Sequence, residues 1–157
     1  MTPVTRYSPA RTRLPPRQFS VRTATPADAE ALAALCAQAR HCISAEEVAA
    51  DLASITKHGG IVLVAVDAGE HVIALLHMTA HHRLGMPALA EICGLFVDHS
   101  ARGEHIGTTL LATAESWARN RDLHEIVVNN ALVRDDALAF YCRSGYAPVR
   151  DYLQFRK

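Results

Sequence analysis

The stretch from residue 88 to residue 120 changes twice from one pattern of apolar and polar positions to another. Residues 88–97 form an almost continuous apolar run of strand length, ALAEICGLFV, and the polar segment DHSARGEHIG follows it. From residue 108 the apolar positions recur at helical spacing, on one stripe of an amphipathic helix: Leu110, Leu111, Ala114, Trp117 and Ala118. The stretch therefore predicts a strand, a short loop and a helix.

Two amphipathic helices are predicted before this stretch, each with its own start signal. The first begins at Thr25, because Pro26 follows at the first helical position and Asp28 lies in the first turn. The second begins at Ser44, which forms a capping box with Glu47. We therefore expect two helices in succession before residue 60.

The other apolar runs of this half have strand length. We expect a short strand over residues 19–23, a strand over 61–66 and, after a hairpin turn, its return strand over 71–78. The run IVLVAV at 61–66 is apolar on both faces, which is typical of a strand inside a sheet covered by helices on two sides. Residues 79–87 are predicted to form a polar loop.

Length and composition are those of one folded domain. The chain has 157 residues, of which half are apolar, so a disordered chain is excluded. It has neither an apolar run of membrane-spanning length nor the apolar core of a secretory signal, and we expect a cytoplasmic protein without a membrane partner.

The first residues differ from the rest in composition. Residues 1–18 are rich in Pro, Arg, Ser and Thr and show no helical or strand period, which predicts a flexible extension before a domain over 19–157. An organellar transit peptide is the alternative, and the prolines of this segment argue against the amphipathic helix that it needs.

Charge is unevenly distributed along the chain. The net charge is zero, yet residues 1–22 hold five arginines and no acid, and the remaining residues carry 11 basic and 16 acidic side chains. An acidic domain argues against a nucleic-acid partner and is compatible with a cationic amine substrate.

The four cysteines show no CxxC spacing, and three of them fall on predicted apolar faces. We expect reduced, buried thiols. A metal site built from His81 and His82, or from His41 and Cys42, is the alternative. Neither pair has the spacing of zinc ligands, so no metal is expected.

The predicted loop after the strand at 88–97 contains Arg102, Gly103 and Gly107. A loop that ends at a helix N-terminus presents unpaired backbone N–H groups and the positive end of the helix dipole, which suit a phosphate. A tight turn without a binding role is the alternative. The segment lacks the Lys-Ser or Lys-Thr of a nucleoside triphosphate loop and the three glycines of the dinucleotide fingerprint.

A second stretch, IVVNNALVRDDALAFYCRSGY at residues 126–146, predicts a strand, a polar turn and a short helix. Together the two stretches resemble the GNAT acyltransferase superfamily, whose members bind acetyl-CoA. Arg102 and Gly107 fit the ends of the family's loop motif, and His105 stands in the place of its middle glycine. The later family signature is matched at every position: Ala137, Phe140, Tyr141, Gly145 and Tyr146. The resemblance covers roughly residues 20–157.

The resemblance implies an α/β GNAT fold with a mixed, mostly antiparallel central sheet of six to seven strands, splayed at its centre, and with helices on both faces. The central strand would carry a bulge and diverge from the next parallel strand, and the pantetheine arm of acetyl-CoA would lie in the gap. On this chain, Leu95, Phe96 and Val97 would pair with the pantetheine. The N–H of Leu95 would face the thioester oxygen as an oxyanion donor.

The resemblance also implies a set of pyrophosphate ligands. Arg102 would add positive charge beside the loop amides that bind the phosphates: those of Gly103, Glu104, His105, Ile106, Gly107 and Thr108. Arg134, where many members carry Asn, completes the expected cofactor site. Because glycine normally lets this loop approach the phosphate, the His105 side chain would either obstruct the cofactor or hydrogen-bond to it. We expect acetyl-CoA binding to be retained, without a metal.

Two residues are candidates for the proton steps. Glu91 is the sole acid in an otherwise apolar strand, and in some family members a Glu in an Ala-Glu-Ile sequence acts as the base through water. The alternative is a carboxylate near solvent that pairs with a surface arginine. Tyr141 is the candidate acid, because the family places this hydroxyl near the sulfur; the alternative is a core aromatic residue.

These observations predict an N-acetyltransferase that uses acetyl-CoA and acts on a primary amine by direct attack in a ternary complex. The expected acceptor is a small molecule rather than a protein, and a homodimer is usual in the family. The alternative is an acyl-CoA-binding or regulatory protein of the same fold without turnover, for which His105 and an uncertain base would argue.

Overall fold

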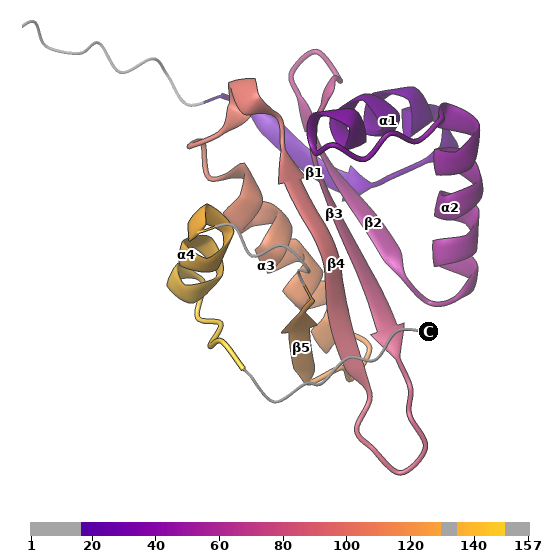
Figure 1. Ribbon diagram of the computed structural model, residues 1–157, viewed down its shortest axis with the longest axis vertical. Helices are drawn as coiled ribbons and strands as arrows, with labels where there is room; N and C mark the ends of the chain where they lie inside the picture. Colours follow the sequence, from indigo (N-terminus) through magenta and orange to yellow (C-terminus); the bar gives the residue numbers. More distant parts are fainter. Residues whose placement is uncertain (1–16, 130–134, 150–157) are drawn as a thin grey trace, which may run out of the picture.

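A mixed five-stranded sheet forms the centre of the computed structural model, which describes residues 17–129 and 135–149 (Figure 1). The strands lie in the order β1-β2-β3-β4-β5. The first three pairings are antiparallel, and β4 pairs with β5 in parallel. Their bounds are β1 Phe19–Thr23, β2 Ile61–Asp67, β3 Val72–His81, β4 Leu89–Val97 and β5 Glu125–Val128.

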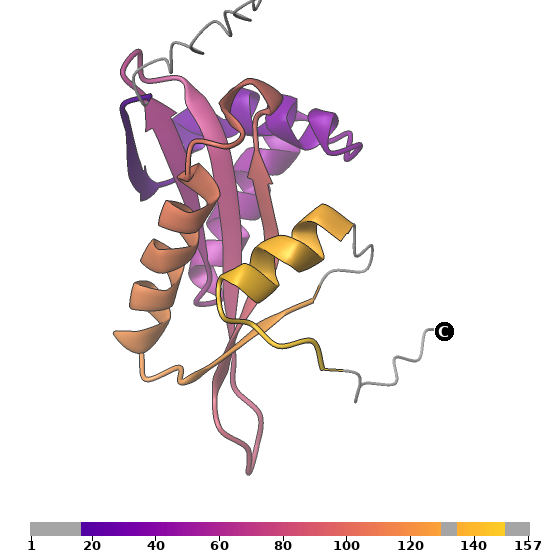
Figure 2. The ribbon, with the colours of Figure 1, turned by 90° about the vertical axis from the view of Figure 1, so that its left-hand side faces the viewer.

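Helices cover both faces of this sheet, as expected. The helices α1 and α2 lie on one side, and α3 and α4 lie on the other (Figures 1 and 2). Their bounds are α1 Ala29–Gln38, α2 Ala45–Lys57, α3 Ile106–Arg119 and α4 Asp135–Arg143, with short 3-10 helices at Pro26–Asp28 and His99–Ala101.

The two faces of β2 belong to two separate apolar clusters. Leu63 and Ala65 pack into the cluster that contains the buried stripe of α3, whereas Val62, Val64 and Val66 pack with α1 and α2. Such two-sided burial explains why this strand is a continuous apolar run rather than an alternating one.

Both predicted helix starts are present. At α2 the Ser44 hydroxyl accepts a hydrogen bond from the Glu47 backbone N–H at 3.2 Å, and the Ser44 N–H donates to the Glu47 carboxylate at 2.8 Å. The first start, by contrast, opens with a 3-10 turn over Pro26–Asp28 before α1 begins at Ala29. The Asp28 carboxylate there accepts hydrogen bonds from the backbone N–H and the hydroxyl of Thr25.

A bulge in β4 precedes the point where the sheet opens. His77 of β3 pairs with Gly94, and the next residue, Met78, pairs with Ile92, so Cys93 is the extra residue. The parallel ladder between β4 and β5 joins Leu89–Ile92 to Glu125–Val128 and ends there. Residues 94–97 of β4 therefore have no β5 partner among the described residues, which gives the splayed centre that the resemblance implies.

The expected number of strands was wrong. The described residues contain five strands rather than six to seven, and residues 146–149 do not form one. The last residues, 150–157, lie outside the described part of the chain, as do residues 1–16 of the expected extension and Arg134. The loop expected at 79–87 is also shorter, because β3 continues to His81.

The cysteines correct a second expectation. Cys42, Cys93 and Cys142 are exposed and Cys36 is half-buried, so they are not the buried thiols that the apolar pattern suggested. Cys93 occupies the bulge, where strand alternation fails, and Cys42 lies beyond the end of α1. Within the described ranges, no helix combines the length and apolar character that crossing a membrane requires.

Candidate functional site

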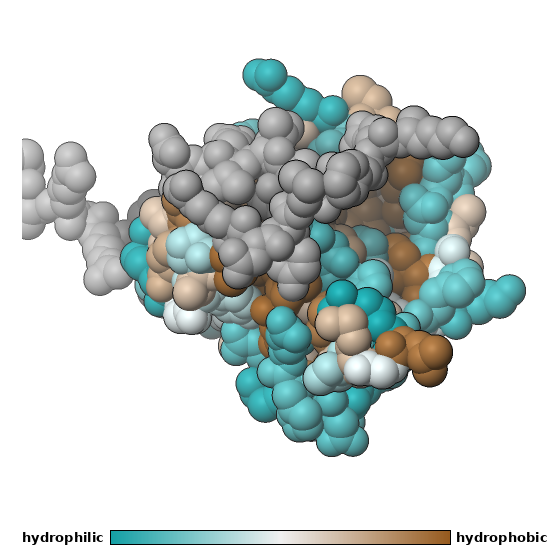
Figure 3. Space-filling view, turned by 60° about the horizontal axis from the view of Figure 1, so that its bottom comes forward, coloured by the Kyte–Doolittle hydropathy of each residue, from teal (hydrophilic) through white to brown (hydrophobic). Residues whose placement is uncertain are grey.

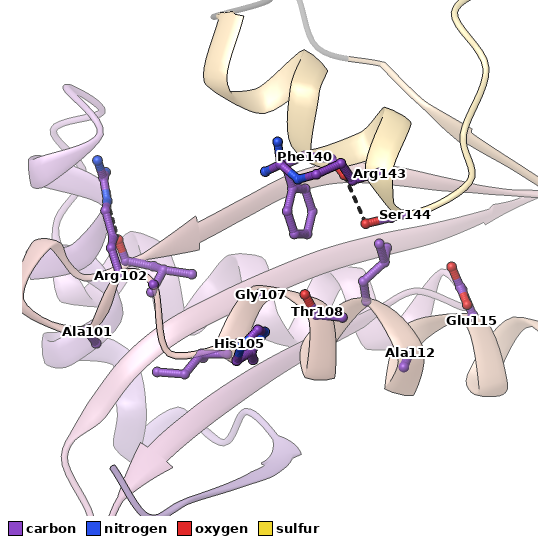
Figure 4. A pocket seen from close by; sticks show the side chains of 14 residues that line it. Ala101, Arg102, His105, Gly107, Thr108, Ala112, Glu115, Phe140, Arg143 and Ser144 are labelled. Carbon is purple, nitrogen blue, oxygen red and sulfur yellow. Dashed lines mark hydrogen bonds between the residues drawn. The ribbon is translucent and has the colours of Figure 1, made fainter. Parts of the chain in front are cut away.

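A cavity of about 510 Å³ opens where the N-terminus of α3 faces the end of α4 (Figure 4). Val97 closes it at the end of β4, and the loop that follows supplies Ala101, Arg102 and Gly103. From the far side, α4 contributes Phe140 and Arg143, and Ser144 follows directly after the helix. Segments about 40 residues apart in the sequence thus form one site, beside the free edge of β4.

The first turn of α3 is directed at this cavity. The helix starts at Ile106, two residues before the predicted position, so Ile106, Gly107 and Thr108 are its first three residues and line the cavity. The N–H groups of a first helical turn have no partner within the helix, and the dipole adds positive charge there. This end of α3 is therefore suited to bind an anion.

His105 precedes this helix in the left-handed conformation, with φ of 61°. Glycine adopts that conformation without steric cost, whereas a side chain makes it less favourable. The His105 side chain lines the cavity, and its carbonyl accepts the Thr109 N–H at 3.0 Å. The histidine at this place therefore has a backbone conformation that favours glycine.

Phe140 and Val97 limit the space available to a side chain at Gly107. A Cβ atom built on Gly107 would lie 3.5 Å from ring carbons of Phe140 and 3.7 Å from a methyl group of Val97. These are ordinary van der Waals distances, so a methyl group fits, whereas a branched side chain would push against Phe140.

Two arginines contribute positive charge to the cavity. Arg102 donates from Nε to the Val97 carbonyl at 3.4 Å, and its guanidinium lies 5.8 Å from the centre of the Phe96 ring. Arg143 reaches the same cavity from α4 and did not emerge from the sequence. Its spacing could have indicated it, since residues 143 and 144 lie three and four positions after Phe140 on one helical face.

Not every expected cofactor ligand lines this cavity. The Glu104 side chain does not line the cavity, and its carboxylate lies 3.9 Å from Nε of Arg17. Val97 lines the cavity, while Leu95 packs against the core and Phe96 stacks edge-on to His99. Of the expected loop ligands, only Glu104 is turned away, so its expected role is confined to its backbone N–H.

A second cavity, of about 760 Å³, lies along β4 and β5 and is lined by Glu91 and Tyr141. Phe140 and Tyr141, neighbours on α4, thus line different cavities. The strand end that borders this cavity leads into the β3–β4 hairpin, where Leu84 and Met86 are exposed. Apolar and hydrophilic surfaces meet at this end of the molecule (Figure 3).

Tyr141 differs from the neighbouring tyrosine in its contacts. Its ring packs edge-on against Phe140 and Tyr146, with ring centres 5.2 and 5.7 Å apart, and burial raises the pKa of its hydroxyl. The Tyr146 hydroxyl donates to the Glu115 carboxylate at 3.0 Å, and burial followed by this hydrogen bond raises its pKa strongly. No hydrogen bond engages the Tyr141 hydroxyl among the described residues, which leaves it available to a ligand.

Glu91 is the third residue of β4, and its partner is a histidine. The Glu91 carboxylate lies 2.8 Å from Nε2 of His81, and no arginine pairs with it within the described residues. His82, the other histidine of the metal alternative, is exposed. No cluster of three or more potential metal ligands exists in the part of the chain that the structure describes.

Comparisons with known proteins match this chain at the level of family and fold. The family model described as Acetyltransferase (GNAT) family matches residues 29–146, which is most of the chain. No curated protein matches.

Solved structures match the fold over nearly the whole chain. A transcriptional regulator from Bacillus halodurans C-125 has a TM-score of 0.78 and 25% identity, covering 89% of this chain and 100% of that one. The aminoglycoside N-acetyltransferase AAC(6')-Iy in complex with CoA has a TM-score of 0.77 and 16% identity, covering 90% and 95%. The aminoglycoside antibiotic 6'-N-acetyltransferase AAC(6')-Ih from Acinetobacter baumannii has a TM-score of 0.76 and 19% identity, covering 89% and 98%.

Proposed function

Because the chain belongs to the GNAT acetyltransferase family, we propose that it transfers an acetyl group from acetyl-CoA to the nitrogen of a primary amine. One observation carries the proposal. The N-terminal end of α3 and a cavity with a candidate base and acid, Glu91 and Tyr141, are both lined by α4, and Val97 at the open end of β4 lines the cavity at α3.

The pyrophosphate of acetyl-CoA would be held at the first cavity. The free N–H groups of Ile106, Gly107 and Thr108 would bind its oxygens, and Arg102 and Arg143 would offset its charge. Of the ligands expected from the sequence, Arg134 lies outside the described residues. The complex of AAC(6')-Iy with CoA, a structural neighbour, supports a CoA site in this fold.

The pantetheine arm would lie along the unpaired edge of β4. Residues 94–97 have no β5 partner among the described residues, so their backbone groups on that side are open to a ligand strand. The N–H of Leu95 would then donate to the thioester oxygen and stabilise the charge that develops on it.

The reaction needs three proton transfers in addition to the replacement of the C–S bond by a C–N bond. Glu91 would take a proton from the ammonium form of the acceptor, because only the neutral amine is a nucleophile. The nitrogen then attacks the thioester carbon, the C–N bond forms and the C–S bond breaks. Tyr141 would donate its proton to the departing thiolate, and the second proton lost by the nitrogen restores the tyrosine. The products are an amide, free CoA and one released proton.

The proposed acceptor is a small molecule rather than a protein. Two structural neighbours are named as aminoglycoside N-acetyltransferases, which supports N-acetylation as the chemistry without identifying this substrate. The second cavity combines apolar groups such as Ile126 and Leu138 with the carboxylates of Glu91 and Glu125, which suits an amine on a partly apolar body.

A second function is favoured by one observation, the side chain of His105 in the place of a glycine at the anion site. The protein would then bind acyl-CoA without turnover. Release of free thiol from acetyl-CoA in the presence of an amine separates the two functions.

The test of the proposal removes one hydroxyl. Tyr141→Phe keeps the ring packing, so CoA should raise the melting temperature as in the unmodified protein, while the chemical step should slow by about ten- to a thousandfold. Thiol release is measured with an aminoglycoside, a polyamine and an arylalkylamine as amine probes.

Tyr146→Phe is the matched control for this variant. It removes a hydroxyl that already donates to Glu115, so it should cost about 1 kcal/mol of stability and slow the chemical step far less than Tyr141→Phe does. Equal rates for Tyr141→Phe and the unmodified protein, with chemistry limiting, would make Tyr141 a core aromatic residue.

A further inference from the structure

A histidine of the neighbouring strand holds the Glu91 carboxylate. Nε2 of His81 lies 2.8 Å from Oε2 of Glu91. Antiparallel pairing of β3 with β4 places Thr79 opposite Glu91 and His81 opposite Leu89, so the two side chains project from one face of the sheet at diagonal positions. Because a carboxylate only accepts hydrogen bonds, the proton of this contact is carried by Nε2 of His81.

A third side chain restricts the imidazole. The Thr79 hydroxyl lies 3.0 Å from the same Nε2 and 3.4 Å from the sulfur of Cys93. Cys93 occupies the bulge of β4, and the sheet opens directly after it. The contacts therefore connect the proposed base to the backbone distortion that creates the cofactor gap.

The pair is partly shielded and faces the second cavity. The Glu91 side chain is 22% exposed and that of His81 is 44% exposed, and both line the cavity together with Tyr141 of α4. A charge-assisted hydrogen bond at this depth is stronger than one at the open surface, because water screens it less.

Other charged groups surround the pair. Arg83 and Glu125 line the same cavity, from the β3–β4 hairpin and from β5. On β3, burial lowers the pKa of His77, while the charges of Asp51 on α2 and of Glu91 raise it. Among these groups, His81 is the one that contacts the Glu91 carboxylate within the described residues, which makes it the group that fixes the direction of the carboxylate.

We propose that His81 is a positioning residue for the acetyl transfer: it holds Oε2 of Glu91 so that Oε1 is directed at the acceptor amine. The inference rests on the proposed function. Without the imidazole the carboxylate can rotate about three side-chain bonds, and fewer of its orientations are productive. His81 itself takes no proton from the amine, so its loss should lower kcat and leave the KM for acetyl-CoA unchanged.

The contact is tested first without any activity measurement. In NMR spectra, the ring signals of His81 should shift when Glu91→Gln removes the carboxylate charge, and those of His82 should not. Unchanged His81 signals would overturn the inference, because the pair would not exist in solution.

The role is tested by three variants whose thiol release is measured with the same amine probes. His81→Ala should lower kcat about tenfold at constant KM for acetyl-CoA. His81→Gln keeps an N–H donor on a side chain of similar reach and should recover much of that loss. His82→Ala, the matched control on the next residue, should behave as the unmodified protein.

The outcomes separate this inference from the proposed function. Turnover by the unmodified protein together with an unaffected His81→Ala would overturn the role of His81 alone. A loss in His81→Ala that His81→Gln does not recover would also overturn it, because packing rather than hydrogen bonding would then matter. No turnover by the unmodified protein with any of the probes, despite a melting-temperature shift with CoA, would overturn the proposed function and the role of His81 with it.

Discussion

Gly107 shows how a single missing side chain shapes the candidate cofactor site. It lies in the first turn of α3 with Phe140 across the cavity, and there is room at its Cα for a methyl group. Gly107 therefore favours binding because it leaves space next to the free N–H groups, and not because it adopts an unusual backbone conformation.

A pair of variants at this residue tests the anion site. Gly107→Ala should keep the rise in melting temperature that CoA produces, and should stabilise the helix by about 0.5–1 kcal/mol, because alanine has the higher helix propensity. Gly107→Val should abolish the CoA effect with the fold intact, since its second methyl group displaces Phe140 into the cavity. Thermal unfolding with and without CoA measures both. A CoA effect that persists in Gly107→Val would remove this turn from the site.

At the scale of elements, the ion pair between Arg22 and Asp28 joins β1 to the start of α1. The two side chains form two hydrogen bonds of 2.8 Å, and Asp28 is 6% exposed. Hydrogen bonds from Arg22, and further ones from Thr25, lower the pKa of Asp28 from 3.8 to about 2. The sequence predicted the acid in the first turn but not the arginine that binds it.

This pKa fixes how the pair contributes to stability as pH changes. A carboxyl whose pKa is lower in the folded state stabilises the fold above its unfolded pKa and loses that contribution as pH falls. A shift from 3.8 to about 2 corresponds to about 2 kcal/mol, present at pH 7 and lost between about pH 4 and pH 2.

Asp28→Asn should therefore lower the free energy of unfolding by about 2 kcal/mol at neutral pH, and the difference from the unmodified protein should vanish near pH 2. Urea unfolding at several pH values measures it. Asp51→Asn, at an exposed position of α2, is the control and should change stability little. A pH-independent difference would show that the Asp28 charge is not what stabilises this junction.

At the scale of the whole molecule, two helical layers and an opening sheet create the candidate site together. The loop before α3 and the end of α4 meet only because both helices lie on the same face of the sheet (Figure 2). The bulge at Cys93 and the short β5 then leave residues 94–97 unpaired on the side toward β5 within the described structure.

Hydrogen exchange tests this arrangement. If CoA lies in the opening of the sheet, its addition should slow amide exchange at residues 94–97, in the first turn of α3 and in α4, because those groups become bonded or covered. Exchange in β2, which is buried between two layers, should not change. Protection of α3 without protection of residues 94–97 would place the pantetheine outside the gap.

The sequence by itself determined the local elements of this protein and their order. The capping box at Ser44, the two-sided apolar run of β2 and the helical stripe of α3 could be predicted, because each depends on residues a few positions apart. The loop and helix motifs around Gly107 and Tyr141 carried the family resemblance for the same reason. The expected number of strands was too high, because the family resemblance implied strands that the described residues do not form.

Only the tertiary structure decided which distant side chains share a site. The contact between His81 and Glu91 depends on the register of β3 against β4, and the exposure of Cys93 depends on a bulge in that register. The entry of Arg143 into the first cavity depends on how α4 lies across α3. The spacing of Arg143 from Phe140 could indicate a shared helix face, but not what that face meets. Register and helix packing are set by burial across the whole sheet, where a shift of one residue changes which face every side chain occupies.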